Sequence, residues 1–198
     1  MTDLSGREEQ RLAALAQYKI VDTPPEKAFD EIAELAAAIC EAPIAIVNLI
    51  ADGRQFFKAE VGLGVREMPL DTSFCAQAIL EEDFLLVPDA AADPRFACNP
   101  LVTGAPHLRF YAGAILKSAE GLPIGTLSVL DVRPRTLTGV QERAIRVLAR
   151  QVMVQLEQRL ATERAATSEA RRAAIVDSAQ DFAIIAMDLD GTIVEWSY

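Results

Sequence analysis

The feature that most limits the fold is a stretch near the C-terminus, residues 140–190, that contains neither proline nor glycine. Both residue types interrupt helices, so their absence over this length allows one long helix. Thr138 and Gln141 match a capping box, in which each side chain bonds the backbone N–H of the other residue, and they predict the start of this helix. If the helix continues to about Ser178, it is roughly 60 Å long at ~1.5 Å per residue.

Apolar side chains recur every three or four residues in the first half of this helix and fade in the second half. A helix face of this kind needs a neighbouring surface. Beyond Leu160 the sequence ATERAATSEARRAA is rich in good helix formers but has too little apolar surface to pack in a globule, which indicates a solvated or dimeric connecting helix. We therefore predict a homodimer, with an interface formed by Leu12, Leu15, Ile145, Leu148, Val152, Leu156 and Leu160.

Upstream of the long helix, the pattern predicts two helices followed by an antiparallel sheet. Capping boxes at Ser5–Glu8 and Thr23–Glu26 predict the two helix starts. The elements predicted next are a hairpin of residues 43–50 and 55–62, a short helix at 73–82, a strand at 84–89, a covering loop at 91–108, and a hairpin of residues 108–117 and 123–131. In the second hairpin Gly113, Ala114 and Gly125 indicate a close approach of backbone or ligand, or a bulge.

Composition excludes several classes of function. Of the 198 residues, 51% are hydrophobic and 24% are charged, which is enough apolar surface for a packed domain. With a net charge of −10 and scattered basic residues, the chain lacks the basic stripe that nucleic acid binding needs. The N-terminus is polar, and no apolar run approaches the ~20 residues that cross a bilayer. We expect a cytoplasmic protein with neither nucleic acid nor membrane as a partner.

The three cysteines, Cys40, Cys75 and Cys98, lie far apart in the sequence. Their odd number and wide spacing fit neither a disulfide framework nor a zinc site. We expect them to be small buried side chains, and we expect no metal.

The segment AIIAMDLDGTIVEW, residues 183–196, supports two interpretations. Asp188 and Asp190 are spaced as in the nucleophile loop of dehalogenase-type phosphatases. Such an enzyme also needs a lysine and further acidic residues downstream, and the six residues after Thr192 contain no lysine and one acidic residue. We favour a β-hairpin with an Asp-x-Asp-Gly turn, which resembles the opening of a PAS domain and its Trp-Ser pair, here Trp196-Ser197, and keep the phosphatase as a remote alternative.

From about residue 5 to 160 the chain closely resembles a bacterial GAF domain. The segments that carry this resemblance are RLAALAQYKIVDTPPEKAFDEIAELAAAIC, RQFFKAEVGL, DTSFCAQAI, DPRFACNPLV, RFYAGAILKSAEGLPIGTLSVLD and LARQVMVQLEQR. The resemblance implies an α+β fold, in which an antiparallel, roughly six-stranded sheet carries the N- and C-terminal helices on one face and a ligand-sized cavity on the other. The expected organisation is a GAF sensory domain at 1–160, a helical linker at 161–177 that continues the long signalling helix, and the start of a truncated PAS domain, a β-hairpin, at 178–198.

The resemblance also implies a ligand pocket formed by the short helix, the covering loop and the second hairpin. Its expected lining is Phe74, Cys75, Arg95, Phe96, Arg109, Tyr111 and Ser128. Phe74 and Phe96 are more often core residues than ligand contacts, because aromatic side chains bury the most area. The two arginines favour an anionic ligand if they face the cavity, or else they pair with Asp89, Asp93 or Asp131. Family members commonly have a small residue, often Cys, at Ser128, so a shared ligand is in doubt.

Known ligand classes of the family leave the ligand of this chain unknown. Bilin attachment uses a Cys followed by His, whereas Cys75 and Cys98 are followed by Ala76 and Asn99. The sole histidine, His107, is a weak candidate for a haem ligand. No motif supports a cyclic nucleotide. We identify no cofactor, and a small-molecule ligand stays open.

In this family a GAF domain usually precedes a PAS domain, a histidine kinase core or a diguanylate cyclase domain. The resemblance therefore implies the sensory and linker part of a sensor histidine kinase, a transferase of a two-component system that passes phosphate from ATP to His. Alternatives are a ligand-free dimerisation scaffold and the sensory part of a diguanylate cyclase. We identify no catalytic residue in this chain, because it has neither a phosphoacceptor-like His in a helical pair nor a Gly-rich ATP lid.

Overall fold

The computed structural model describes residues 4–178, 184–187, 190 and 192–197. The chain divides into two compact units, Met1–Glu157 and Gln158–Tyr198, and the division lies within the long helix α5 (Gly139–Ser178). Within the described part of the chain, no helix combines the length and the hydropathy that a membrane crossing requires.

Six strands of the first unit form one sheet in the order β3-β2-β1-β6-β5-β4, and every neighbouring pair is antiparallel. The prediction of an α+β fold with a roughly six-stranded antiparallel sheet is confirmed. The short edge strand β3 was not predicted, because three residues are too few to show a strand period. The strands are β1 (Ile44–Ile50), β2 (Arg54–Val61), β3 (Glu67–Pro69), β4 (Phe84–Val87), β5 (Phe110–Lys117) and β6 (Pro123–Asp131).

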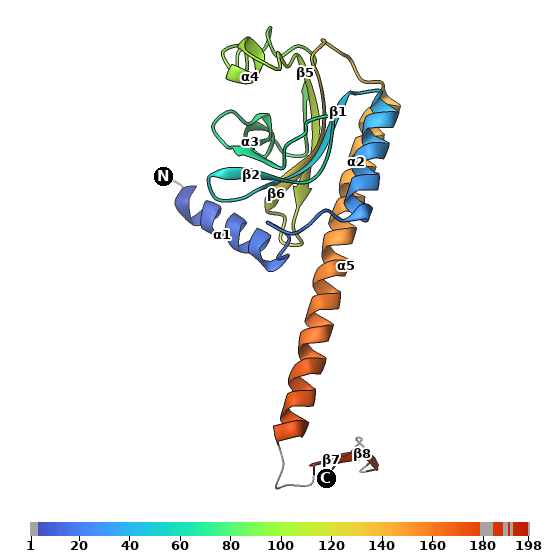
Figure 1. Cartoon of the computed structure of the whole chain (residues 1–198). Coiled ribbons are helices and arrows are strands. Elements are labelled where there is room, and N and C mark those ends of the chain that lie inside the picture. Colours follow the sequence, from blue (N-terminus) through green and yellow to red (C-terminus); the bar gives the residue numbers. More distant parts are fainter. Residues whose placement is uncertain (1–3, 179–183, 188–189, 191, 198) are drawn as a thin grey trace. The chain divides into compact units, whose positions relative to one another are not determined.

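Helices cover both faces of this sheet. Helix α2 (Lys27–Cys40) and the first part of α5 lie on one face, where the Gln141 side chain bonds the Ile39 carbonyl oxygen at 3.1 Å (Figure 1). The short helices α3 (Phe74–Ala78) and α4 (Pro100–Thr103) lie on the opposite face. All seven residues of β1 are buried as a result. Strand β1 therefore shows a continuous apolar run rather than an alternating pattern.

Helix α1 (Leu4–Gln17) is tied to the rest of the first unit by two polar contacts. Arg11 is buried and donates from Nη1 to the Ile50 carbonyl oxygen at 2.6 Å. Just past the helix, the Tyr18 hydroxyl donates to Glu157 on α5 at 2.5 Å. Burial, and then the hydrogen bond to Glu157, raise the pKa of Tyr18 far above its ordinary value.

The apolar stripe of α5 packs inside one subunit. Ile145, Val152 and Leu156 are at most 1% exposed and Leu148 is 9% exposed within a single chain. Leu15 is also buried and Leu12 is half-buried, whereas Leu160 belongs to the second unit. The expectation that a second copy shelters this stripe is therefore corrected for the first unit. The apolar period identified a helix face that needs cover, but a sheet of the same chain satisfies that need as well as a partner does.

The three predicted capping boxes have different outcomes. Thr138 and Gln141 bond each other's backbone N–H groups at 3.2 and 3.0 Å, as predicted. Helix α1 already includes Leu4, so Ser5 lies inside the helix rather than before it. Helix α2 begins after Glu26, which makes no side-chain cap.

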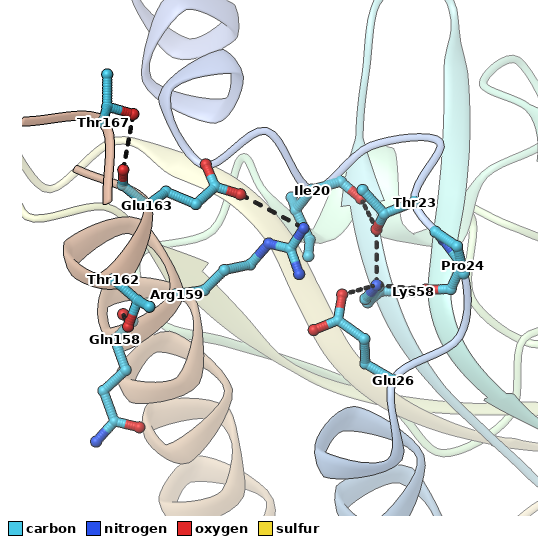
Figure 2. Close-up of polar contacts among 10 residues, drawn as sticks. All are labelled: Ile20, Thr23, Pro24, Glu26, Lys58, Gln158, Arg159, Thr162, Glu163 and Thr167. Atoms are coloured by element: carbon cyan, nitrogen blue, oxygen red, sulfur yellow. Dashed lines mark hydrogen bonds and ion pairs between the residues drawn. The ribbon is translucent and has the colours of Figure 1, made fainter. Parts of the chain in front are cut away.

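Lys58 explains why the second capping box does not form. Its ammonium group is fully buried and donates to Thr23 Oγ1 at 2.7 Å, to the Pro24 carbonyl oxygen at 2.7 Å and to Glu26 Oε1 at 2.6 Å (Figure 2). It also lies 5.4 Å from the centre of the Phe29 ring. A buried charge costs much more than an uncapped helix end, so the side chains before α2 bond the ammonium instead.

In the second unit, strands β7 (Ile184–Met187) and β8 (Ile193–Ser197) pair antiparallel, which confirms the predicted C-terminal hairpin. Asp190 lies in its turn. Asp188, the proposed phosphatase nucleophile, lies outside the described residues.

Removing the carboxylate that faces Lys58 should destabilise the fold. We expect Glu26→Ala to lower the free energy of unfolding by about 2–3 kcal/mol, because it removes the carboxylate that pairs with a fully buried ammonium at 2.6 Å. Lys58→Met should cost less, since it removes the charge and keeps apolar volume. Urea denaturation measures both. The matched control Glu31→Ala breaks an exposed pair with Lys27 and should change stability by less than about 0.5 kcal/mol. If Glu26→Ala changes stability no more than Glu31→Ala does, the carboxylate of Glu26 does not stabilise the buried ammonium of Lys58.

Candidate functional site

A small pocket lies on the α3 face of the sheet, between α3, the covering loop and strands β1, β2 and β6. Its volume is about 70 Å³, which is several times smaller than the ~300 Å³ at which drug-sized ligand sites begin. Polar atoms enter its wall from Gln55, Ser73 and Cys75. The apolar lining consists of Ile46, Phe57, Leu63, Met68, Phe74, Leu101, Pro106, Leu108 and Leu130.

Three aromatic rings fill the space beside this pocket. Phe74 stacks on Phe96 with ring centres 4.4 Å apart and planes 4° apart, and on Tyr111 with centres 5.7 Å apart. All three side chains are at most 3% exposed. Of the three, Phe74 lines the pocket, while Phe96 and Tyr111 support it from behind. The stack holds α3 and the covering loop against the sheet.

A polar cluster at Cys75 lies beneath α3. The Tyr111 hydroxyl donates to Cys75 Sγ at 3.5 Å, and Ser128 Oγ lies 3.8 Å from the same sulfur. Burial, and then the neighbouring Cys75, raise the pKa of Tyr111 well above its ordinary value, so the phenol stays protonated and donates. The structure therefore brings five predicted pocket residues together, Phe74, Cys75, Phe96, Tyr111 and Ser128.

Glycines of the second hairpin make room for neighbouring groups of the chain. A methyl group at Gly113 would lie 2.4 Å from the Tyr111 hydroxyl oxygen, and one at Gly125 would lie 2.0 Å from the Asn48 carbonyl oxygen. Real Cβ atoms do not approach so closely, so both positions require glycine. Gly125 shows the close approach of backbone that was expected, and the pairing register shifts next to it, between Leu116 and Lys117. Gly113 makes room for a side chain instead.

The two candidate arginines do not line the pocket. Arg109 binds Asp89 through two hydrogen bonds of 2.7 Å, and this pairing lowers the pKa of Asp89. Arg95 is half-exposed and pairs with Asp93 and Glu81 at 2.8 and 3.1 Å. A carboxylate from a nearby loop thus satisfies each guanidinium, which is the second of the two alternatives open from the sequence.

The sequence-based prediction missed polar side chains that strands β1, β2 and β6 contribute to the α3 face of the sheet. Gln55 donates to the Pro69 carbonyl oxygen and accepts from Asn48 at 3.3 Å, and all the side chains involved are buried. Among the described residues, Asn48 Oδ1 and Thr126 Oγ1 have no hydrogen-bond partner. The available signal was polar residues inside the strand runs PIAIVNLI and PIGTLSVLD, which are otherwise apolar.

No cluster of three or more potential metal ligands occurs in the part of the chain that the structure describes. His107 is exposed and adopts a positive φ of 61° in the covering loop. Its neighbour Pro106 lines the pocket, but the imidazole itself is not part of the lining.

The six-stranded antiparallel sheet, covered by helices on both faces and with a pocket under α3, defines an α+β sensory-type domain. The sequence pattern of the GAF domain family matches residues 24–156, two thirds of the chain. The chain belongs to the GAF domain family and is a regulatory domain of the kind found in signalling proteins.

Individual relatives extend this result. Over 128 residues the chain is 43% identical to a cyclic di-GMP phosphodiesterase of Pseudomonas aeruginosa, covering 65% of this chain and 22% of that enzyme. The fold of the present chain is similar to that of the chromophore-binding domain of a bacteriophytochrome from R. palustris. The TM-score is 0.58 at 12% sequence identity, and the similarity covers 82% of this chain and 64% of the bacteriophytochrome chain. The fold is also similar to that of the GAF domain of an Acinetobacter phosphoenolpyruvate-protein phosphotransferase, with a TM-score of 0.56, 16% identity and coverage of 83% and 97%. The chain thus spans about a fifth of the phosphodiesterase and less than two thirds of the bacteriophytochrome domain.

The burial of the thiols gives a direct test of this site. Cys98 is exposed, whereas Cys40 and Cys75 are buried, and burial raises the pKa of Cys40 to about 11. At about pH 8 we expect one thiol per native chain to react with a disulfide reagent, and all three after denaturation, because only an accessible thiolate reacts. Cys98→Ser should remove the native reaction. If a thiol of the native Cys98→Ser variant still reacts rapidly, the side chain of Cys75 or Cys40 is accessible and the burial described here is wrong.

Proposed function

We propose that this GAF domain is the sensory input of a bacterial signal-transduction protein in the cytoplasm and acts on further domains through α5. The observation that carries the proposal is the continuity of α5, a helix of 40 residues that begins against the sheet and extends past Glu157 into the second unit. A continuous helix transmits a displacement at one end along its length.

The pocket under α3 is the proposed entry point for the signal. Its lining is mostly apolar, and Gln55, Ser73 and Cys75 offer the polar contacts that orient a ligand. A volume of about 70 Å³ suits only a small, largely uncharged molecule. Because Arg95 and Arg109 are paired outside this pocket, an anionic ligand there would have no guanidinium to bind it.

A ligand-free dimerisation scaffold is the second candidate. The stacked rings of Phe74, Phe96 and Tyr111 and the pairing of Arg109 favour it, because they leave little open polar space on this face. The two candidates differ in one measurable property, which is whether a small molecule occupies the pocket.

Two classes of output are proposed for the complete protein. The first class is a sensor histidine kinase, which the sequence resemblance implies. In this proposal a PAS domain begins at about residue 178, between the GAF domain and the kinase. The relative of 43% identity supports an output in cyclic di-GMP turnover, in keeping with the diguanylate cyclase alternative. Autophosphorylation with ATP supports the kinase, whereas synthesis or hydrolysis of cyclic di-GMP supports the second class.

The proposed homodimer needs an interface other than the buried stripe of α5. Val140, Val147 and Val154 repeat every seven residues on the outer face of this helix and are 76%, 47% and 43% exposed. A repeat of seven keeps these side chains along one line, and β-branched residues at this spacing suit a partner helix in a coiled coil. We propose that this valine stripe meets the same stripe of a second copy.

Blocking the pocket separates the sensor from the scaffold. If the domain is a sensor, native mass spectrometry should find a small molecule bound to the purified chain or taken up from a metabolite mixture. Leu101→Trp, which places an indole in the lining, should abolish this binding. Leu80→Trp adds the same ring at a side chain that is 76% exposed and should leave binding unchanged. Absence of any bound molecule favours the scaffold.

Placing a charge in the valine stripe should weaken self-association. We expect Val147→Lys to raise the dimer dissociation constant at least about tenfold, because an ammonium between the two helices loses hydration and lies one turn from Arg143 and Arg150, which repel it. Sedimentation equilibrium measures this constant. Val132→Lys adds the same charge at a similarly exposed valine outside α5 and is the control. A wild-type chain that stays monomeric at high micromolar concentration refutes the dimer.

A further inference from the structure

A second cavity lies between α5 and the C-terminal half of strand β5, next to Asp83. Its volume is about 260 Å³, several times that of the pocket under α3. Its apolar lining consists of Ala114, Ile115, Ala149 and Met153. Its charged lining consists of Asp83, Lys117, Arg146 and Arg150.

The cations around this groove are only partly neutralised. Arg146 pairs with Asp83 at 2.5 Å and, outside the groove, with Glu142 at 2.8 Å. Lys117 lies 3.9 Å from Asp83, which is longer than a hydrogen bond. Arg150 has neither a hydrogen bond nor an ion pair with any residue in the described part of the chain. The groove therefore carries a positive charge, counting Glu142, in a chain whose net charge is −10.

We propose that this groove binds the phosphate group of a small phosphorylated molecule. Arg150 supplies the planar donor fork that matches phosphate oxygens, and Lys117 supplies a second charged donor from β5. The apolar lining holds the organic part of the molecule against Ala114 and Met153. A volume of about 260 Å³ accommodates one phosphate with a ring or short chain attached.

Other anionic partners fit the groove less well. Nucleic acid needs a row of cations along its backbone, and the groove has three cations interrupted by Asp83. An acidic peptide would have to place its carboxylates beside Asp83 and Glu142, which repel them. A compact phosphate can accept from Arg150 and Lys117, and the carboxylate that lines the groove, that of Asp83, is already paired with Arg146.

This site is separate from the pocket under α3 and holds whether or not that pocket binds a ligand. A bound phosphate would bridge β5 to α5 through Lys117 and Arg150. It would therefore fix the helix against the strand, at the part of the molecule through which we propose that signals leave the domain.

Titration of the intact chain with phenyl phosphate, followed by calorimetry and by the NMR signals of arginine Nε–H groups, tests the site. We expect saturable binding, tighter than that of inorganic phosphate because the ring covers the apolar lining. Arg150→Gln and Lys117→Gln should each weaken binding about tenfold, the loss that one charge-assisted hydrogen bond corresponds to. Arg143→Gln changes the same charge on an exposed arginine two turns earlier on α5 and should leave binding unchanged.

Several outcomes would overturn the proposal. Equal weakening by all three variants would indicate a general effect of charge rather than a site. Binding of phenol as tight as that of phenyl phosphate would show that the phosphate is not recognised. Tighter binding of a glutamate-rich peptide than of phenyl phosphate would assign the groove to a protein partner. Circular dichroism and thermal unfolding check that Arg150→Gln and Lys117→Gln remain folded.

Discussion

The whole first unit depends on the covering of the central strands β1 and β6 by helices on both faces. Every side chain of β1 is buried, so a charged group beside these strands must find its partner inside the protein, although the neutral Asn48 Oδ1 and Thr126 Oγ1 have none. The ammonium of Lys58 does so by gathering Thr23, Pro24 and Glu26, which fixes the chain between α1 and α2. The strands themselves approach so closely that Gly125 leaves no room for a methyl group beside Asn48. Both features follow from the same requirement, which is a dry interior on either side of the sheet.

The same constraint decides what kind of site the α3 face can offer. Large aromatic rings bury the most apolar area, and here they also occupy the volume that a ligand would need. The Tyr111 side chain extends over Gly113, and its hydroxyl donates a hydrogen bond to Cys75 Sγ. The hydroxyl therefore has a partner within the protein. The guanidinium of Arg109 is held at the surface by Asp89. What stays open on this face is a small apolar pocket with a few polar contacts, which restricts a ligand there by size and charge together.

The sequence predicted local structure better than it predicted partners. Periodicity and turn residues identified both hairpins, and the reciprocal bonds of Thr138 and Gln141 are local enough to be seen in the sequence. The cap at Thr23 failed because Lys58, a residue 35 positions away, claims its hydroxyl. The apolar stripe around Val152 was correctly identified as a face that needs cover, but periodicity does not say which surface covers it. For Arg109, composition shows a cation and not the carboxylate that it meets, so only the fold distinguishes a ligand-binding arginine from a paired one.

Strand β5 contributes residues to both faces of the sheet, Tyr111 to the aromatic stack and Ala114 to the groove. Side chains alternate along a strand, so Tyr111 and Gly113 lie on the α3 face, whereas Ala112 and Ala114 lie on the α5 face, and Ala114 lines the groove. A displacement of the Tyr111 ring therefore acts on the backbone that supports α5. Because Ile145 and Val152 are fully buried, a shift of α5 has to repack these side chains. Coupling across the sheet then requires that α5 has two discrete packing arrangements. A ligand that binds between β5 and α5 favours the arrangement for which it has the higher affinity.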